Sequence, residues 1–175
     1  MISRLAQVNV ARLLAPLDSE LLFDFVASLD EVNASADDAP GFIWRLQSEE
    51  GNATSIKAFE WDRGDSPGVI INMSVWESVD DLSRWIKGPL HRAVLVQRRK
   101  WFERVAEATT ALWWVSGNHL PSTHEAESKV LHLRHYGPTV TAFTFKDTFE
   151  APDDEHRTPR GDVASVSRAP APPRG

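Results

Sequence analysis

Hydrophobic and polar positions alternate near the start of the chain. In residues 5–13 (LAQVNVARL), small apolar residues alternate with Gln7 and Asn9. A period of two is typical of a strand with one buried face. The amides of Gln7 and Asn9 would then face either a pocket, where they could bind a substrate carbonyl or hydroxyl, or solvent.

The rest of the pattern predicts strands and helices in a regular order. After the first strand we expect a helix at about 22–39, strands at 42–47 and 69–76, helices at 78–87 and 89–105, a strand at 110–115, a helix at 123–135 and a short strand at 141–145. A polar segment at 48–68, with a strand-like piece at 54–59, reads as an extended hairpin or flap. This order is β-α-β-β-α-β with a helical insertion, so the fold class is α+β and ferredoxin-like.

Two helix starts carry capping signals. Ser78 precedes two aspartates in the manner of a capping box, and Ser122 or Thr123 is the expected N-cap of the helix at 123–135.

The stretch VIINMSVW at 69–76 is the strongest strand of the chain. Its run Val69-Ile70-Ile71 suggests burial on both faces at that end. Asn72, Ser74 and Trp76 share one face. A polar residue in such a strand requires a partner, which either a ligand or a neighbouring helix can supply.

Composition narrows the class of protein. The 175 residues correspond to one domain, at 1–150, followed at 151–175 by a Pro-, Asp- and Arg-containing tail with the composition of a disordered segment. The chain has no cysteine, so disulfides and thiolate catalysis are excluded. Its net charge of −6, with acids spread along the chain, argues against a nucleic-acid partner. Without a signal peptide or an apolar run of about 20 residues, we expect a cytoplasmic protein that does not span a membrane.

Residues 72–102 (NMSVWESVDDLSRWIKGPLHRAVLVQRRKWF) carry a resemblance to a known superfamily. A strand ending in Trp leads through Glu-Ser into a helix, and a second helix has a His near its start. This arrangement resembles the antibiotic-biosynthesis-monooxygenase-like superfamily of dimeric α+β barrels. With LAQVNVAR, PGFIWRLQ, LWWV and GPTVTAFTF in the same order, residues 5–145 resemble the domain of unknown function 3291 within it.

The resemblance implies a homodimer whose two sheets close a barrel, with a pocket between sheet and helices in each protomer. Superfamily members include cofactor-independent oxygenases, polyketide cyclases, isomerases and heme-degrading monooxygenases. The expected ligand is therefore a small hydrophobic molecule. The fold restricts the class of ligand more than it restricts the type of reaction.

The heme-degrading branch can be compared residue by residue. Its pattern has an Asn on the first strand, a Trp on the helix after the third strand, and an axial His ten residues beyond that Trp. Asn9 and Trp85 occupy matching places, but the axial position is Leu95. His91 lies about one helical turn earlier. Heme binding or degradation is therefore a second hypothesis.

His91 is the predicted proton-transfer residue. It lies where a helix begins, and histidine titrates near neutral pH without special help. The alternative is a capping or surface histidine. Arg98 shares its helical row and would bind either an anionic substrate group or a neighbouring acid, and the same alternatives apply to Arg45.

The tryptophans are expected either to wall a pocket or to fill a core. Trp113 and Trp114 are adjacent on one strand and must face opposite sides of the sheet. A sheet face closed by a second protomer would cover the one that leaves the core, which independently suggests a dimer.

We therefore predict an enzyme that performs cofactor-independent oxygenation, cyclisation or isomerisation of an aromatic or polyketide-like substrate. A non-catalytic dimeric binding module for an apolar ligand is a third hypothesis. His91 is the predicted catalytic residue; the predicted substrate-binding residues are Gln7, Asn9, Trp44, Asn72, Ser74, Trp76, Trp85, Arg98 and Trp101. No metal site is expected. The sequence leaves the reaction and the substrate open.

Overall fold

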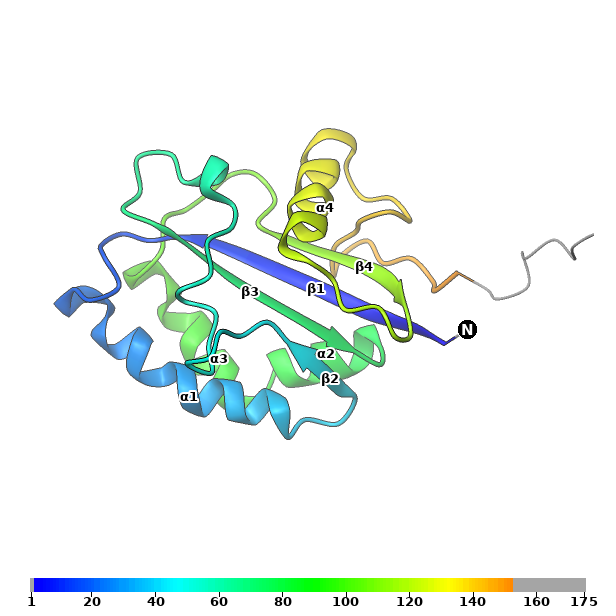
Figure 1. The fold of residues 1–175 in the computed structure, drawn as a ribbon, viewed down its shortest axis with the longest axis horizontal. Helices are drawn as coiled ribbons and strands as arrows, with labels where there is room; N and C mark the ends of the chain where they lie inside the picture. The colour runs from blue at the N-terminus through cyan, green and yellow to red at the C-terminus, as the bar shows by residue number, and fades with distance from the viewer. Residues whose placement is uncertain (1, 153–175) are drawn as a thin grey trace, which may run out of the picture.

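The computed structural model describes residues 2–152, in which four antiparallel strands form one sheet of order β2-β3-β1-β4 (Figure 1). The strands are β1 (Ser3–Arg12), β2 (Phe42–Arg45), β3 (Val69–Trp76) and β4 (Thr110–Ser116). β1 pairs along its length with β3 and with β4, so these three strands make the body of the sheet. The predicted tail lies outside the described residues from residue 153 onward.

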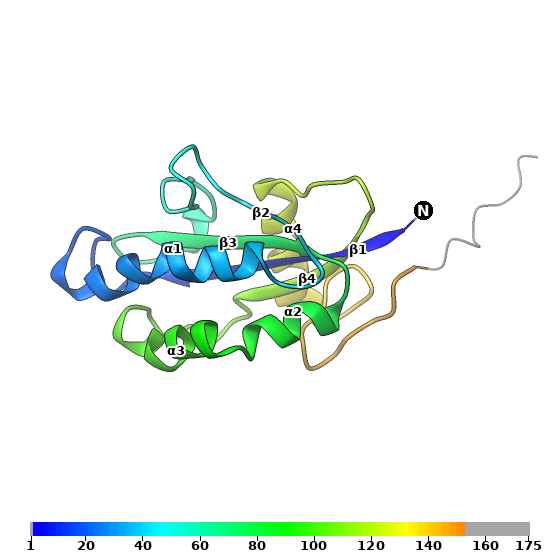
Figure 2. The ribbon, with the colours of Figure 1, turned by 90° about the horizontal axis from the view of Figure 1, so that it is seen from below.

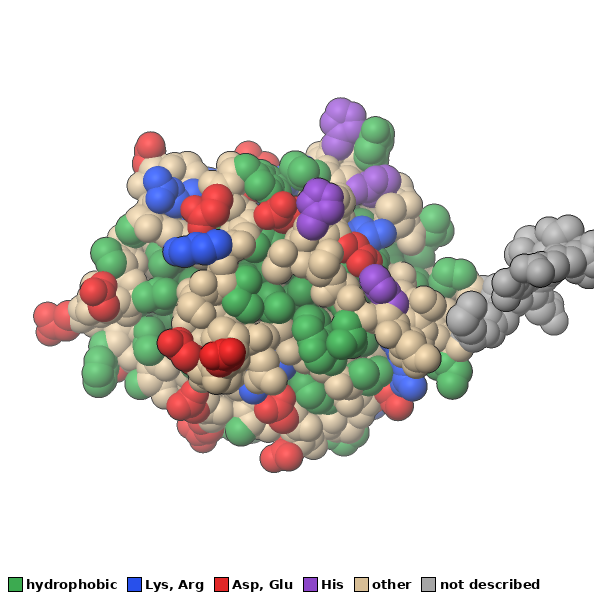
Figure 3. Space-filling view, viewed as in Figure 1, with side chains coloured by type: hydrophobic (Ala, Val, Ile, Leu, Met, Phe, Trp, Pro, Cys, Tyr) green, Lys and Arg blue, Asp and Glu red, His purple; other side chains and the backbone are tan. Residues whose placement is uncertain are grey.

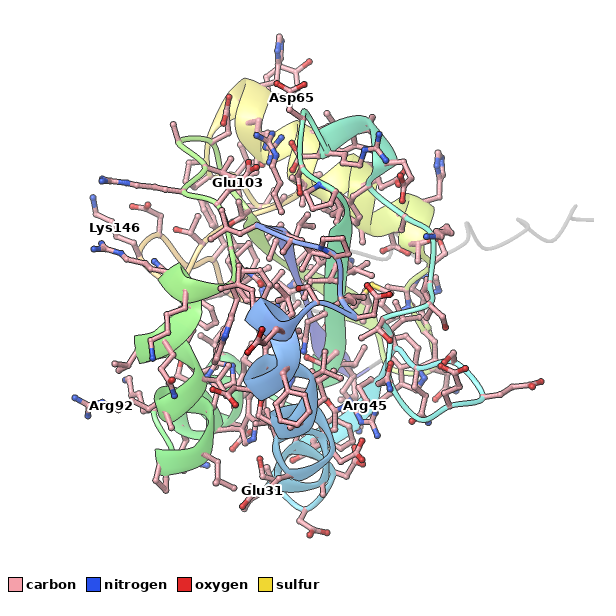
Figure 4. The ribbon with its side chains drawn as sticks, turned by 90° about the vertical axis from the view of Figure 1, so that its left-hand side faces the viewer. Glu31, Arg45, Asp65, Arg92, Glu103 and Lys146 are labelled. Carbon is pink, nitrogen blue, oxygen red and sulfur yellow. The ribbon has the colours of Figure 1, made fainter. Side chains whose placement is uncertain are left out.

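Four α-helices connect and cover the strands. They are α1 (Phe23–Asp37), α2 (Val79–Ile86), α3 (Pro89–Gln97) and α4 (Thr123–Tyr136). The order β1-α1-β2-β3-α2-α3-β4 on this sheet is the ferredoxin-like plan, so the predicted α+β fold class is confirmed. α2 and α3 follow each other beside the strands (Figure 2), and in the view along the strands α1 and α3 lie on one side and α4 on the other (Figure 4).

The face of the sheet toward α1, α2 and α3 buries large side chains. Leu5 of β1 and Trp76 of β3 pack with Leu82 of α2 in one cluster, and Phe25 of α1 packs with Trp101 in another. Alternation along the strands then puts Gln7, Asn9, Asn72 and Ser74 on this same face.

The opposite face is covered by the chain itself. Val8, Met73 and Trp113 are buried there beneath α4 and the segment at 53–62. Trp113 donates its indole N–H to Glu125 of α4 at 2.8 Å. A second protomer is therefore not needed to cover Trp113, because α4 covers it, and the prediction of a dimer from this tryptophan pair is wrong. The homodimer stays a prediction of the resemblance, and a dimer formed through this face would have to displace α4.

Buried hydrogen bonds hold this cover in place. Asp62 is buried and pairs with Arg12 of β1 and Arg134 of α4, each at 2.7 Å from its Oδ1. The backbone N–H of Phe59 donates to Glu127 of α4 at 2.6 Å. The segment between β2 and β3 is thus tied to both the sheet and α4.

The local predictions differ from the structure in four places. Residues 54–55 form a turn and residues 56–59 are irregular rather than a strand, and Phe59 has a left-handed φ of 58° that ends any extended run. β2 stops at Arg45. α3 ends at Gln97, since the chain turns so that Leu14 can donate its N–H to the Trp101 carbonyl. Residues 141–145 contribute only isolated bridges, one of them between Leu112 and Phe143.

Both capping predictions are confirmed. Ser78 accepts a hydrogen bond from the Asp81 N–H, and Ser122 accepts one from the Glu125 N–H. Within residues 2–152, no helix has the length and apolarity that crossing a membrane requires.

Candidate functional site

Four of the predicted site residues meet on the helix-facing side of β1 and β3. Gln7 pairs directly with Ser74, and Asn9 pairs with Asn72 in the next row. The Asn9 amide donates to Thr110 Oγ1 of β4 at 2.8 Å. We call these five residues the polar floor.

The polar floor is buried at one end and open at the other. Ser74 is 4% and Gln7 6% exposed, whereas Asn9 is half-buried and Asn72 is exposed. The expected burial of β3 on both faces concerned Val69–Ile71, where Val69 and Ile71 are buried and Ile70 is half-buried. Asn72 lies beyond residues 74–76, the part of β3 that pairs with β2.

A stack of aromatic rings leads away from the polar floor. Trp76 lies 5.5 Å from Trp85, and Trp85 lies 4.4 Å from His91, measured between ring centroids. The Phe42 ring meets the other side of the cluster, 5.3 Å from Trp76. Trp85 and His91 come from consecutive helices, so the short turn at Gly88 between α2 and α3 is what brings them together.

His91 and Trp85 line a pocket of about 280 Å³ between the end of α1 and the elbow of α2 and α3. Its lining is mostly apolar and comes from the helices and their connections: Ser35, Ala39, Pro40, Asp81, Arg84, Trp85, Gly88, Pro89, Leu90 and His91. The pocket has the composition expected for a small apolar ligand. No polar-floor residue lines this pocket, and Trp76, which donates to Ser74 of the floor, packs on Trp85 of the pocket. The structure therefore divides the predicted site residues into two groups joined by this tryptophan pair.

One ion pair lies at the edge of the pocket. Arg84 donates to Asp81 at 2.8 Å, and Asp81 also accepts from the Ser78 hydroxyl at 2.6 Å. These two hydrogen bonds, that from Ser78 foremost, lower the pKa of the Asp81 carboxyl. The edge therefore carries paired charges rather than a free anion.

The chemistry of the pocket depends on the state of His91. Its Nδ1 lies 3.3 Å from the carbonyl oxygen of Ile86, which can only accept, so Nδ1 carries the proton. Burial lowers the pKa of His91, and the hydrogen bond to Ile86 opposes part of that effect. The neutral ring then has its lone pair on Nε2, an atom with no hydrogen-bond partner among residues 2–152. This arrangement fits a general base.

Ser35 on α1 was missed by the sequence analysis. It accepts the Trp85 indole N–H at 3.1 Å and donates to the Val32 carbonyl at 2.7 Å. These two bonds hold the Trp85 ring against His91. The sequence shows only a serine on a helix, and its partner lies 50 positions away, so no local signal identifies it.

Three predicted substrate-binding residues lie apart from both groups. Trp44 packs against the cluster on the α4 side of the sheet. Trp101 is 3% exposed and packs in the Phe25 cluster at the far end of the helices. Arg98 is exposed in the 3-10 turn after α3. Neither tryptophan lines the pocket, so the expectation that Trp101 walls it is wrong for this structure. The register shift between Phe42 and Trp44 turns Trp44 to the α4 side of the sheet, and α3 ends before Trp101. Arg45 forms an ion pair with Asp37 at 2.8 Å.

The residues present do not form the heme site of the heme-degrading branch. Leu95, at the axial position, is part of α3 and has no ligating atom. His91 has one ring nitrogen engaged with Ile86, and its pocket of about 280 Å³ is at the small end of cofactor and ligand sites.

The other described histidines gather over α4 (Figure 3). His119 pairs with Glu125 at 2.6 Å, and His132 bonds Thr139 at 2.8 Å. Within residues 2–152, no three His, Asp or Glu side chains are close enough together to hold a metal ion.

Comparison with known proteins places the chain in a family. The model of the domain of unknown function DUF3291 matches residues 4–159. No curated protein matches. The chain is similar to the solved structure of SnoaB, a cofactor-independent oxygenase from Streptomyces nogalater, at 15% identity and a TM-score of 0.40 over 69% of this chain and 99% of that one.

It is also similar to Rv0793 from Mycobacterium tuberculosis, at 13% identity and a TM-score of 0.42 over 68% of this chain and 99% of that one. A conserved protein from Methanosarcina mazei gives 10% identity and a TM-score of 0.42 over 65% of this chain and 92% of that one.

Proposed function

Because the chain belongs to the DUF3291 family, whose description assigns no activity, we propose from its own site that it is a small-molecule enzyme. Its substrate is a hydrophobic, aromatic or polyketide-like molecule. The reaction is an oxygenation, or a cyclisation or isomerisation, that begins with loss of a proton and uses no resident cofactor. The resemblance to the antibiotic-biosynthesis-monooxygenase-like superfamily agrees with this class of chemistry.

One observation carries the proposal: a neutral histidine with a free Nε2 lines an apolar pocket. The Ile86 carbonyl holds Nδ1, and Trp85 packs against the ring, so the orientation of His91 is restrained from two sides. A base that stays unprotonated at neutral pH can accept a proton from a phenol or from a carbon next to a carbonyl.

The substrate supplies the rest of the reactivity. When His91 Nε2 takes the proton, the electron pair stays on the substrate as a phenolate or enolate. That anion attacks an internal carbonyl in a cyclisation, takes back the proton at another carbon in an isomerisation, or reacts with dioxygen in an oxygenation. An apolar lining excludes water, which favours reaction of the anion along these routes.

The polar floor would hold oxygen atoms of the substrate. Gln7, Asn9 and Asn72 offer amide groups on one sheet face. Trp76 donates to Ser74 on this face and packs on Trp85, whose ring lies beside His91. The substrate-binding assignments of Trp44, Arg98 and Trp101 are not retained.

The first test identifies the ligand and uses His91 to ask whether it is turned over. Mass spectrometry of small molecules that co-purify with the full chain should find an aromatic or polyketide-like compound. Incubation in air should convert it in the wild type and leave it unchanged in His91→Gln, which keeps a hydrogen-bonding side chain of similar length but has no base. His124→Gln, an exposed position on α4, serves as the control.

The outcomes separate the hypotheses. If the wild type and His91→Gln both bind the compound and neither forms a product, the chain is a binding module and not an enzyme. Equal turnover by His91→Gln would show that this histidine is not the base. Light scattering on the same preparation tests the homodimer that the resemblance implies.

A further inference from the structure

The orientation of the Gln7 amide follows from a chain of three side chains on the polar floor. The Trp76 indole nitrogen lies 2.9 Å from Ser74 Oγ, and Ser74 Oγ lies 3.0 Å from Gln7 Oε1. An indole N–H can only donate, so Ser74 accepts from Trp76. The Ser74 hydroxyl donates its own proton to Gln7 Oε1, so the Gln7 amide presents its oxygen to Ser74.

The same chain leaves the Gln7 amide nitrogen free to donate. Gln7 is 6% exposed, and its Nε2 donates to no residue within 2–152. The fully buried polar atoms without a partner in that range are Arg4 Nε and Ser19 Oγ, so Gln7 Nε2 is not fully buried. A buried amide with an unused donor favours a ligand that accepts a hydrogen bond.

The neighbouring amide does not compete for this role. Asn9 Nδ2 already donates to Thr110 Oγ1 at 2.8 Å. Asn72, in the same row, is exposed and is not fixed by a hydrogen bond to another described side chain. Gln7 is therefore the floor residue whose donor is both oriented and available.

We infer that Trp76 and Ser74 are positioning residues that make Gln7 a hydrogen-bond donor for an acceptor oxygen, a ketone or enolate oxygen, of the substrate. The inference rests on the proposed function, and it adds a selectivity: the site prefers apolar ligands with an acceptor oxygen over the same skeleton without one. A single neutral hydrogen bond gives a preference of about three- to tenfold in Kd.

Two probes with one carbon skeleton test this selectivity. 1-Tetralone carries a ketone, and tetralin has none. Titration of the full chain, followed by tryptophan fluorescence, should give a Kd for 1-tetralone about three- to tenfold lower than that for tetralin. Gln7→Met, which keeps length but has no donor, should bring the ratio to about one with the tetralin Kd unchanged. Gln47→Met, at an exposed glutamine after β2, should keep the wild-type ratio.

The positioning role is tested at Ser74. Ser74→Ala removes the hydroxyl that orients the amide and should lower the ratio, whereas Ser74→Thr retains the hydroxyl and should restore it. His91→Gln should leave the ratio unchanged, because it acts in the other group.

A measurement on the wild type avoids any dependence on variant folding. The side-chain amide resonance of Gln7 in a ¹⁵N-correlated NMR spectrum should move with 1-tetralone and stay in place with tetralin. Equal Kd values for the two probes, or a Gln7 resonance that does not move when 1-tetralone binds, would overturn the inference about Gln7 and leave the proposed function in place. Failure of both probes to bind would overturn it together with the proposed apolar site.

Discussion

Arg134 on α4 donates two hydrogen bonds to Asp62, from Nη1 to Oδ1 at 2.7 Å and from Nη2 to Oδ2 at 3.0 Å. Arg12 on β1 donates to the same carboxylate at 2.7 Å. One buried acid therefore joins the segment before β3 to the first strand and to the last helix. This junction holds the cover over the sheet face opposite α1, α2 and α3.

Removing the charge of Asp62 should destabilise the fold. Asp62→Asn leaves two arginines partly buried beside a neutral amide, and breaking a buried ion pair costs about 3–5 kcal/mol. We expect the free energy of unfolding, measured in urea, to fall by about that amount. Asp65→Asn, on the same segment and exposed (Figure 4), should change it by less than about 0.5 kcal/mol. Equal effects of the two variants would show that the triad does not hold the segment.

The same acid predicts a pH dependence of stability. Burial alone would raise the pKa of Asp62, but the hydrogen bonds from Arg134 and Arg12 outweigh it and hold the pKa below its usual value. The folded carboxyl then binds a proton less readily than the unfolded one. Its contribution is complete above the unfolded pKa of about 3.9 and is lost as pH falls through the folded pKa. Urea unfolding below about pH 5 should show a weaker pH dependence for Asp62→Asn than for wild type, and parallel curves would contradict the assignment.

His91 should titrate below the usual range of histidine. Burial lowers its pKa, so its NMR titration midpoint should lie below the value of about 6.5 for an unperturbed histidine. Because the base is the neutral form, kcat/KM should be flat near neutral pH and fall as the pH drops through that midpoint. The free energy of unfolding should also fall as the pH drops, because the unfolded histidine takes up a proton at a higher pH than the folded one. A midpoint above about 6.5 would remove the physical basis for a neutral base.

Trp85 should depend on Ser35 for its position. Ser35→Ala removes the acceptor of the indole N–H, which should cost about 1 kcal/mol of stability and loosen the packing of Trp85 on His91. The His91 NMR midpoint should then move, because its surroundings become more hydrated. Ser28→Ala is a matched control, a half-buried serine on the same helix that bonds only a backbone carbonyl. An unmoved His91 midpoint in Ser35→Ala would show that the serine does not act on the pocket.

Hemin should bind weakly if at all at this site. Leu95 offers no axial ligand, so titration with micromolar hemin should give no saturable shift of the Soret band. A saturable shift that disappears in His91→Gln would contradict this prediction and would show that His91, one helical turn before Leu95, ligates the heme iron.

The sequence by itself determined the features that depend on neighbouring residues. Alternation assigned Gln7 and Asn9 to one face of β1, and Ser74 and Trp76 to one face of β3, because side chains in a strand must point to alternate sides. Ser78 and Ser122 were identifiable as N-caps because a cap bonds within its own first turn. The element order was enough for the ferredoxin-like plan.

Only the tertiary structure decided which sequence-distant groups meet. Trp113 is covered by α4, Ser35 accepts the indole N–H of Trp85, and Asn72 is exposed although its neighbour Met73 is buried. The division of the site into the His91 pocket and the polar floor likewise depends on how Trp76 packs against Trp85. These contacts join segments that lie tens of residues apart in the sequence, so no local periodicity or spacing predicts them. They depend on how the helices pack on the sheet.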